Sequence, residues 1–252
     1  MRMKDLVAVV TGGGSGFGEG ICHAYAAEGA KIVVADINDE NGERVAAALR
    51  DGGAEAVYCR ADVSRSGDMK LLVETAVGRF GRLDVMVNNA GTSHANQPML
   101  NISEEQFDRI YDVNVKSIYH SAMHCVPVFR KQGGGVFVNV ASTAGIRPRP
   151  GLCWYSGSKG AVIALTKAMA IELAPDRIRV NGINPVMGET ALLTTFMGKE
   201  DTPENREKFI ATIPLGRMSR PSDIANAALF LADPASELVT GICVEVDGGR
   251  CI

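Results

Sequence analysis

The chain alternates between short apolar runs and longer stretches in which apolar residues recur at helical spacing. The runs are rich in valine and several are closed by glycine, asparagine or aspartate, which predicts strands. We expect strands at 6–10, 31–35, 56–60, 83–87, 136–140, 179–183 and 242–246, with helices between them at 21–29, 40–50, 67–80, 104–130, 154–174 and 221–232. Strands that alternate with helices favour an α/β fold.

The stretch from 186 to 217 breaks this alternation because it has no clean periodicity. It still carries apolar side chains, such as Met187, Phe196 and Met197, between charged flanks. Long segments of this kind are more often lids than structureless loops, so we expect a lid at about 186–217. No linker or repeat interrupts the chain, and 252 residues suit one domain over 1–252.

A glycine-rich turn, Thr-Gly-Gly-Gly-Ser-Gly-Phe-Gly at 11–18, follows the first predicted strand. Glycine lets the backbone turn sharply and approach a pyrophosphate, whose charge the first amide groups of the next helix can bind. Strand, glycine turn and helix together favour a dinucleotide site. A turn that serves only packing is the alternative.

Asp36 closes the second predicted strand. A carboxylate in this place can accept hydrogen bonds from the ribose hydroxyls of NAD and would repel the additional phosphate of NADP. No arginine follows Asp36 to bind a 2′-phosphate, so the sequence favours NAD over NADP. The alternative is that Asp36 only caps the helix that begins near Asp39.

Tyr155 and Lys159 are four residues apart near the start of a predicted helix, so their side chains share one face. The reference pKa of a phenol is about 10, and a neighbouring ammonium lowers it toward the range useful for proton transfer. The pair is therefore a candidate proton-transfer device, although this spacing also occurs by chance on many helices.

The composition argues against several classes of protein. A net charge of -3 without basic clusters gives no basis for binding nucleic acid or a membrane surface. The six cysteines are scattered, which indicates reduced thiols in a cytoplasmic protein. His120 and His124 are at helical spacing but lack a third ligand, so we expect no metal. The first apolar run is too short for a signal peptide or a membrane span.

The chain resembles the short-chain dehydrogenase/reductase family over its whole length, through motifs that occur in order: Thr11-Gly12-x-x-x-Gly16-x-Gly18, Asn88-Asn89-Ala90-Gly91, Asn114, Ser142, Tyr155-x-x-x-Lys159 and Asp247-Gly248-Gly249. The resemblance implies a Rossmann fold, which is a doubly wound sheet of about seven parallel strands with helices on both faces. It also implies a homotetramer.

By this resemblance, a catalytic tetrad consists of Asn114, Ser142, Tyr155 and Lys159. Ser142 would hold the substrate oxygen, and Tyr155 would exchange a proton with it while hydride passes to or from the nicotinamide. Lys159 would lower the pKa of Tyr155 and bond the nicotinamide ribose. Asn114 would hold a water in the proton relay.

The resemblance also implies an NAD site built from Gly12, Ser15, Gly16, Phe17, Gly18, Asp36, Asp62, Val63, Asn88, Ala90, Gly91, Tyr155, Lys159, Pro185 and Thr190. Asp62 could instead cap the helix that follows it. One departure is Val186, which stands where the family usually has glycine, with Gly188 two residues further on. The loop that carries Thr190 can therefore follow a different path.

We expect a small-molecule substrate, a secondary or benzylic alcohol or its carbonyl, with an anionic or polar group. His94, Arg147 and Arg149 follow strand ends and could face it, or could be solvated loop residues. Activity of the 3-oxoacyl-carrier-protein reductase or glucose 1-dehydrogenase type is an alternative, although Asp36 argues against an NADPH-dependent reductase. A non-catalytic nucleotide-sensing scaffold is an alternative of another class, which would tolerate an incomplete tetrad.

Overall fold

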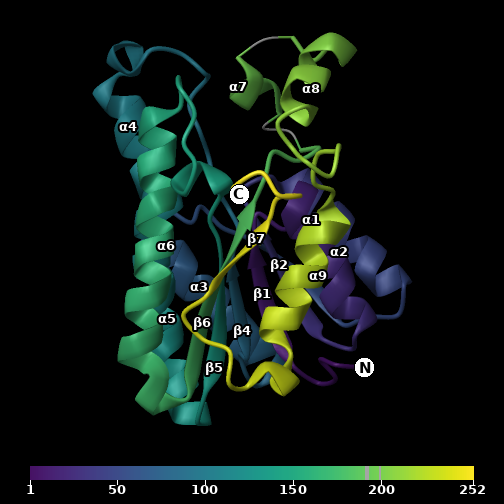
Figure 1. The fold of residues 1–252 in the computed structure, drawn as a ribbon. Helices are drawn as coiled ribbons and strands as arrows, with labels where there is room; N and C mark the ends of the chain where they lie inside the picture. The colour runs from purple at the N-terminus through teal and green to yellow at the C-terminus, as the bar shows by residue number, and fades with distance from the viewer. Residues whose placement is uncertain (191–192, 199) are drawn as a thin grey trace.

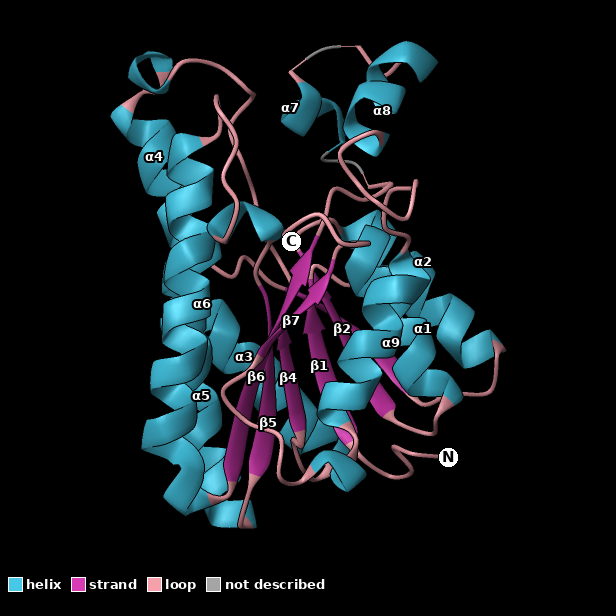
Figure 2. Ribbon diagram, in the orientation of Figure 1, coloured by secondary structure: helices cyan, strands magenta, loops and turns pink. Residues whose placement is uncertain are grey.

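The computed structural model describes residues 1–190, 193–198 and 200–252. Its centre is a seven-stranded sheet in the order β3-β2-β1-β4-β5-β6-β7, in which every neighbouring pair is parallel. The strands are β1 (Val7–Thr11), β2 (Lys31–Asp36), β3 (Ala56–Arg60), β4 (Val85–Asn88), β5 (Gly135–Val140), β6 (Ile178–Pro185) and β7 (Cys243–Val246). Their carboxyl ends all point to one edge of the sheet (Figure 2).

Helices cover both faces of this sheet (Figure 1). One face packs against α1 (Gly16–Ala27), α2 (Asp39–Asp51) and α9 (Pro221–Ala232), and the other against α3 (Ser66–Phe80), α5 (Ser117–Gln132) and α6 (Cys153–Leu173). In β1, Ala8 and Val10 enter the first apolar cluster and Val7 and Val9 the second. Burial on both faces explains the unbroken apolar runs, and the predicted fold class is confirmed.

Two predicted helices have different limits in the structure. The helix predicted at 21–29 begins at Gly16, because the end of the glycine turn forms its first turn. The helix predicted at 104–130 consists of α4 (Glu104–Tyr111), a π-helical turn η2 (Asp112–Lys116) and α5. Ser103 and Gln106 form a capping box at the start of α4. Short 3-10 turns lie at η1 (Met99–Asn101), η3 (Thr143–Gly145), η4 (Ala174–Asp176) and η5 (Pro234–Ser236).

The predicted lid segment, 186–217, lies beyond the carboxyl edge of the sheet and contains α7 (Leu193–Met197) and α8 (Pro203–Ile210) (Figure 1). Its residues 191, 192 and 199 are outside the described part. An apolar cluster of its own, separate from the two sheet faces, includes Val186, Met187, Leu193, Met197, Ile213 and Met218. Across the described ranges, none of the helices has both the length and the apolar character that a bilayer crossing needs.

Candidate active site

A cavity of about 530 Å³ opens at the carboxyl edge of the sheet, where ligands bind in open parallel sheets. Loops after β1 to β6, the segment 186–217 and the C-terminal residue Arg250 supply its walls. The predicted residues on these walls are Gly12, Ser15, Gly16, Phe17, Asp36, Asp62, Val63, Ala90, Gly91, Ser142, Arg147, Tyr155, Lys159, Pro185 and Thr190. Gly18, Asn88, His94 and Asn114 are not among the wall residues.

The glycine turn brings backbone to the cavity wall. Gly12 and Gly16 have φ of +62° and +55°, a region that suits glycine. Gly18 lies behind them, and a Cβ there would stand 2.1 Å from the Gly12 carbonyl oxygen, so Gly18 permits the close packing of α1. Ser15, at the N-cap, makes no side-chain cap hydrogen bond. The N-terminus of α1 at this wall suits a phosphate group.

Asp36 is held at the end of β2 by backbone donors. Its Oδ2 accepts the Gly14 N–H at 2.9 Å and its Oδ1 accepts the Asn38 N–H at 2.9 Å. The cap of α2 is Asn38, not Asp36. Arg44 donates to the Gly14 carbonyl, but its guanidinium is already paired with Glu19, Nη1 to Oε1, at 2.8 Å. The carboxylate therefore meets the cavity, and the arginine that reaches this turn, Arg44, is already paired with Glu19.

Asp62 and Val63 line the cavity after β3. Asp62 does not cap α3, because its Oδ1 accepts the backbone N–H and the Oγ–H of Ser64 at 3.0 and 2.7 Å. Burial raises the pKa of Asp62, but these hydrogen bonds, together with the charges of Arg65 and Arg109, outweigh it, and the net pKa is lowered. An ionised acceptor thus stands in this wall.

Asn89, and not Asn88, faces the cavity after β4. Asn88 is buried and its Nδ2 donates to Asn139 Oδ1 at 2.8 Å, which ties β4 to β5. Asn89 Nδ2 donates to the Thr11 carbonyl at 2.8 Å, and Thr11 Oγ1 accepts the N–H groups of Asn89 and Ala90 at 3.0 Å. This brace fixes the loop after β4 to the glycine turn.

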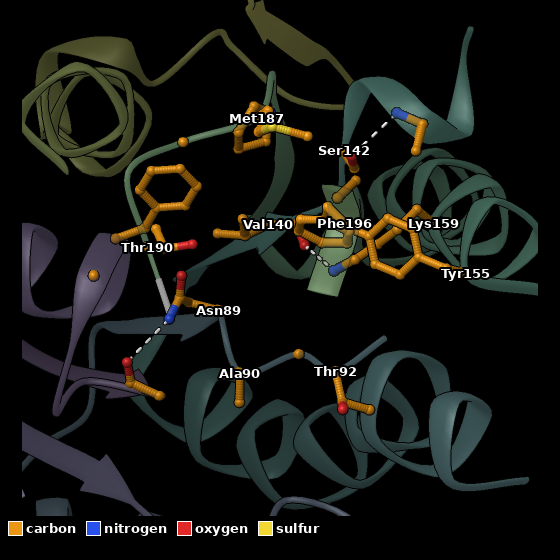
Figure 3. A pocket seen from close by; sticks show the side chains of 18 of the residues that line it. Asn89, Ala90, Thr92, Val140, Ser142, Tyr155, Lys159, Met187, Thr190 and Phe196 are labelled. Atoms are coloured by element: carbon orange, nitrogen blue, oxygen red, sulfur yellow. Dashed lines mark hydrogen bonds between the residues drawn. The ribbon is translucent and has the colours of Figure 1, made fainter. Parts of the chain in front are cut away.

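Tyr155, in the first turn of α6, and Ser142, after β5, both lie on the cavity wall (Figure 3). Tyr155 is 7% exposed. Burial raises the pKa of Tyr155 to about 12, while the side chains of Ser142 and Arg149 act to lower it. Ser142 Oγ accepts the Ala144 N–H at 3.0 Å, which fixes the hydroxyl in place. Tyr155, which can act as an acid or a base, and Ser142, which can donate a hydrogen bond, therefore lie on the same wall.

Lys159 lies one turn along α6 from Tyr155. Its Nζ donates to the Val140 carbonyl at 2.9 Å and stands 5.9 Å from the centroid of the Tyr155 ring. Burial lowers the pKa of Lys159 to about 8. We expected this ammonium to lower the pKa of Tyr155, but the pKa of Tyr155 is raised, because burial of the phenol outweighs the lowering by Ser142 and Arg149.

Asn114 lies behind the wall, in the π-helical turn η2. The side chain is buried, its Oδ1 accepts the Thr92 N–H at 2.8 Å, and its Nδ2 donates to the Thr92 carbonyl at 2.9 Å and to Ser158 Oγ at 3.0 Å. Single π-helical turns are frequent at functional sites, and this one carries a fully bonded amide. Asn114 thereby joins the loop after β4 to α6.

The opposite wall comes from the segment after β6. Thr190, in this segment, lies across the cavity from Tyr155, as does Asn89 from the loop after β4 (Figure 3). Val186 continues the sheet pairing through its N–H, which donates to the Val246 carbonyl at 3.2 Å. At Gly188 a Cβ would stand 2.3 Å from the Phe17 ring, so glycine is needed there, two residues after the position at which the family usually has it.

The residues considered for contact with substrate, and the histidines from which we expected no metal site, have mixed positions. His94 is buried, and its Nδ1 lies 2.8 Å from the Ala95 carbonyl oxygen. Arg147 is on the cavity wall, together with Arg149 and Arg250. His124 Nε2 lies 3.0 Å from Ser66 Oγ. In the ranges that the structure describes, no three His, Cys, Asp or Glu side chains gather as metal ligands would.

Comparisons with known proteins show the family to which the chain belongs. The family model described as "Enoyl-(Acyl carrier protein) reductase" matches residues 12–250. A 4-formylbenzenesulfonate dehydrogenase of Comamonas testosteroni is 50% identical over 100% of both chains. This chain belongs to the short-chain dehydrogenase/reductase family. It is an oxidoreductase of that family, as the sequence predicted.

Solved structures of the short-chain dehydrogenase/reductase family have the same fold. A 3-ketoacyl-(acyl-carrier-protein) reductase of Brucella melitensis, crystallised with NADH, is 45% identical, with a TM-score of 0.93 over 99% of this chain and 100% of that one. A short-chain type dehydrogenase/reductase of Mycobacterium marinum is 34% identical, with a TM-score of 0.91 over 98% and 96% of the two chains.

Sequence reasoning missed several wall residues of this short-chain dehydrogenase/reductase. Thr92, Phe209 and Arg250 were given no role, yet all line the cavity. Thr92 follows a recognised motif by one residue, so its place at a strand end was the available sign. Phe209 and Arg250 reach the cavity through tertiary packing, which cannot be predicted from a local sequence pattern.

Proposed function

We propose that this short-chain dehydrogenase/reductase transfers hydride between NAD and a small alcohol or carbonyl compound, with a secondary or benzylic alcohol as substrate in the oxidative direction. The observation that carries the proposal is that Ser142, Tyr155 and Lys159 meet on the wall of a cavity that also includes Asp36 and the glycine turn. The 50% identical Comamonas relative, named for an aromatic aldehyde, supports the benzylic class.

In this proposal each residue of the tetrad has a separate task. Ser142 donates a hydrogen bond to the substrate oxygen, and Tyr155 takes the alcohol proton in oxidation or returns it in reduction. Asn114 Oδ1 and Lys159 Nζ both border Gly91, at 3.3 and 3.4 Å from the position of a Cβ on that glycine. Polar groups on both sides suit a water that relays the proton onward from Lys159.

The wall residues fit NAD. When bound, NAD supplies the hydride acceptor. The glycine turn and the α1 N-terminus would hold its pyrophosphate, and Asp36 its adenosine ribose. Asp62 and Val63 would contact the adenine, with Ala90, Gly91, Pro185 and Thr190 toward the nicotinamide. NADP fits less well, because Asp36 repels a 2′-phosphate and Arg44 is paired with Glu19.

The test is the appearance of reduced nicotinamide when the purified protein is given NAD or NADP with a panel of benzylic, sugar and hydroxyacyl alcohols. We expect turnover with NAD and a benzylic or secondary alcohol. Turnover with NADP alone would contradict the role of Asp36. Binding of NAD without turnover of any alcohol would favour the nucleotide-sensing scaffold.

A second candidate is reduction of 3-oxoacyl thioesters. The observation that favours it is the Brucella melitensis relative, 45% identical and named for that reaction. The same assay, run with NADH or NADPH and a 3-oxoacyl thioester, separates the two candidates. Faster thioester reduction than aldehyde reduction would select this second function.

We also propose a homotetramer that acts in the cytoplasm. Tyr119 and Met123 on α5 and Ile171 on α6 are 59%, 55% and 81% exposed, although each is apolar enough to favour burial. A neighbouring subunit would cover them. All six cysteines are free thiols, which suits a reducing compartment. Light scattering of the purified protein tests the assembly, since a monomer would contradict it.

A further inference from the structure

The C-terminal residues form part of the cavity wall. The buried Asp247 follows β7, and its Oδ1 and Oδ2 accept the N–H groups of Gly249 and Cys251 at 2.9 and 2.7 Å. The carbonyl of Gly248 accepts the Leu215 N–H at 3.0 Å, which joins this turn to the end of the segment 186–217. The turn therefore holds Arg250 at the cavity.

Arg147 holds the same tail from the other side. Its Nη1 donates to the Arg250 carbonyl at 2.6 Å and lies 3.5 Å from the Ile252 carbonyl oxygen. We predicted that Arg147 contacts substrate, but this donor group is engaged with backbone. This contact fixes the backbone of Arg250, and with it the position from which its guanidinium extends.

Arg149 and Arg250 are cations on the wall of the same cavity. Within the described chain, neither forms an ion pair with an Asp or Glu side chain. Burial and the charge of Arg250 both lower the pKa of Arg149. Two guanidinium groups that repel each other at a partly buried site are stabilised by an anion with several oxygens, such as a sulfonate or a carboxylate.

Aromatic rings on this wall contact both Tyr155 and Arg149. The Phe196 ring is 5.0 Å from the Tyr155 ring, and the Arg149 guanidinium carbon lies 4.7 Å from the centroid of the Phe209 ring. Leu152, Met187 and Ile213 add apolar surface to the same cavity. Such a wall suits a flat ring, since aromatic side chains pack edge to face or offset on aromatic ligands.

We propose that Arg149 and Arg250 form an anion subsite that binds the sulfonate or carboxylate of an aryl alcohol whose hydroxyl lies at Ser142 and Tyr155. Arg147 is a positioning residue, because it acts through the backbone of Arg250. This inference rests on the proposed function and names the substrate class and the residues that select it.

The first test is independent of turnover: calorimetric titration of the NAD-loaded protein with benzenesulfonate, and separately with benzoate. Each anion forms charge-assisted hydrogen bonds, so we expect Arg149→Gln and Arg250→Gln to weaken binding by roughly 10- to 100-fold. The tighter anion identifies the preferred group. The matched control is Arg130→Gln, which removes an arginine paired with Asp176 on the surface. We expect it to change binding less than about twofold.

The second test compares kcat/KM for 4-(hydroxymethyl)benzenesulfonate and for benzyl alcohol. The ratio between the charged and the neutral substrate should fall by roughly 10- to 100-fold in Arg149→Gln and Arg250→Gln. Arg147→Gln should lower the same ratio, and Arg147→Lys, which keeps a donor, should restore part of it. A merely structural loss would lower both rates equally and leave the ratio unchanged.

The outcomes separate this inference from the proposed function. Unchanged anion binding in both arginine variants overturns the anion subsite, whatever alcohols are oxidised. Weakened anion binding in these variants supports the subsite, even if none of the alcohols is oxidised. The absence of alcohol oxidation would instead contradict the proposed dehydrogenase activity.

Discussion

The rings of Phe196 and Tyr155 lie 5.0 Å apart, centroid to centroid, at an angle of 52°. Phe196 belongs to α7, so this contact is where the segment beyond the sheet meets the candidate proton donor (Figure 3). The contact helps to keep Tyr155 at 7% exposure, and burial is the main cause of its raised pKa. The segment therefore shapes the chemistry of Tyr155 as well as access to it.

We predict that Phe196→Ala lowers kcat/KM for an aryl alcohol by about fivefold, because an aromatic contact contributes roughly 1 kcal/mol beyond its buried area. The pKa that governs alcohol oxidation should also fall, since Tyr155 becomes better hydrated. Kinetics across a pH series measure both effects. Phe230→Ala, at a 44% exposed position on α9, is the matched control. Equal losses in the two variants would show that Phe196 has no specific role.

The raised pKa of Tyr155 determines the sign of the pH dependence. Oxidation needs unprotonated Tyr155 to accept the alcohol proton, and that form becomes more abundant as pH rises. We therefore predict that kcat/KM for oxidation rises with pH, up to about tenfold per unit between about pH 6 and pH 9, whereas reduction stays nearly constant, because Tyr155 remains protonated over this range. A flat or falling oxidation profile would contradict the assignment of Tyr155 as base.

Lys159→Met extends this prediction. The pKa of Lys159 is lowered to about 8, so its ammonium loses a proton inside the assay range. Without that cation nearby, the unprotonated form of Tyr155 is less favourable. The rising limb of the oxidation profile should move to higher pH in the variant. If the oxidation rate of the variant rises at the same pH as that of the wild type, Lys159 does not influence the pKa of Tyr155.

Asp36 should determine the choice of cofactor. Asp36→Asn removes the charge that repels a 2′-phosphate, and its single amide oxygen can still accept one of the two N–H groups, of Gly14 or Asn38, that the carboxylate accepts. We predict that the preference for NAD over NADP, taken as the ratio of kcat/KM values, falls by roughly 10- to 100-fold. Asp39→Asn, a nearby change at a residue paired with Arg60, is the control. An unaltered ratio in Asp36→Asn would exclude this role.

The parallel sheet could be predicted from sequence because its strands are apolar on both faces and end in small or polar residues. Val7 and Val9 pack on one side, Ala8 and Val10 on the other, and the run reads as strand without any tertiary information. The π-helical turn could not be predicted. Its side-chain spacing differs from an α-helix by one residue, and only the buried partners of Asn114 reveal it.

The candidate site was predictable where a motif lies at a strand end, as for Gly12, Asp36 and Ser142, or at the start of a helix, as for Tyr155. It was not predictable where tertiary packing decides which side chain faces the cavity. Asn88 and Asn89 are adjacent in one motif, but only Asn89 lines the wall. Arg250 depends on the Asp247 turn and on Arg147, which is 103 residues distant in sequence.

Asn114→Leu tests the buried amide. The substitution leaves the Thr92 N–H and carbonyl without their partner. Each unsatisfied buried group costs roughly 1–3 kcal/mol, so we predict a loss of about 2 kcal/mol or more in the free energy of unfolding, measured by urea denaturation. Asn101→Leu, at an exposed position, should change it by less than about 0.5 kcal/mol. Equal stability of the two variants would argue against the bracing role of Asn114.

The central claim is that Tyr155 transfers the proton in an NAD-dependent oxidation. The most direct measurement is the single-turnover rate of NADH formation by wild type and Tyr155→Phe, at saturating NAD and with the alcohol that the panel selects. Loss of general acid–base catalysis predicts a fall of at least roughly 100-fold, with NAD affinity preserved. A Tyr155→Phe rate within a few-fold of wild type would contradict the account.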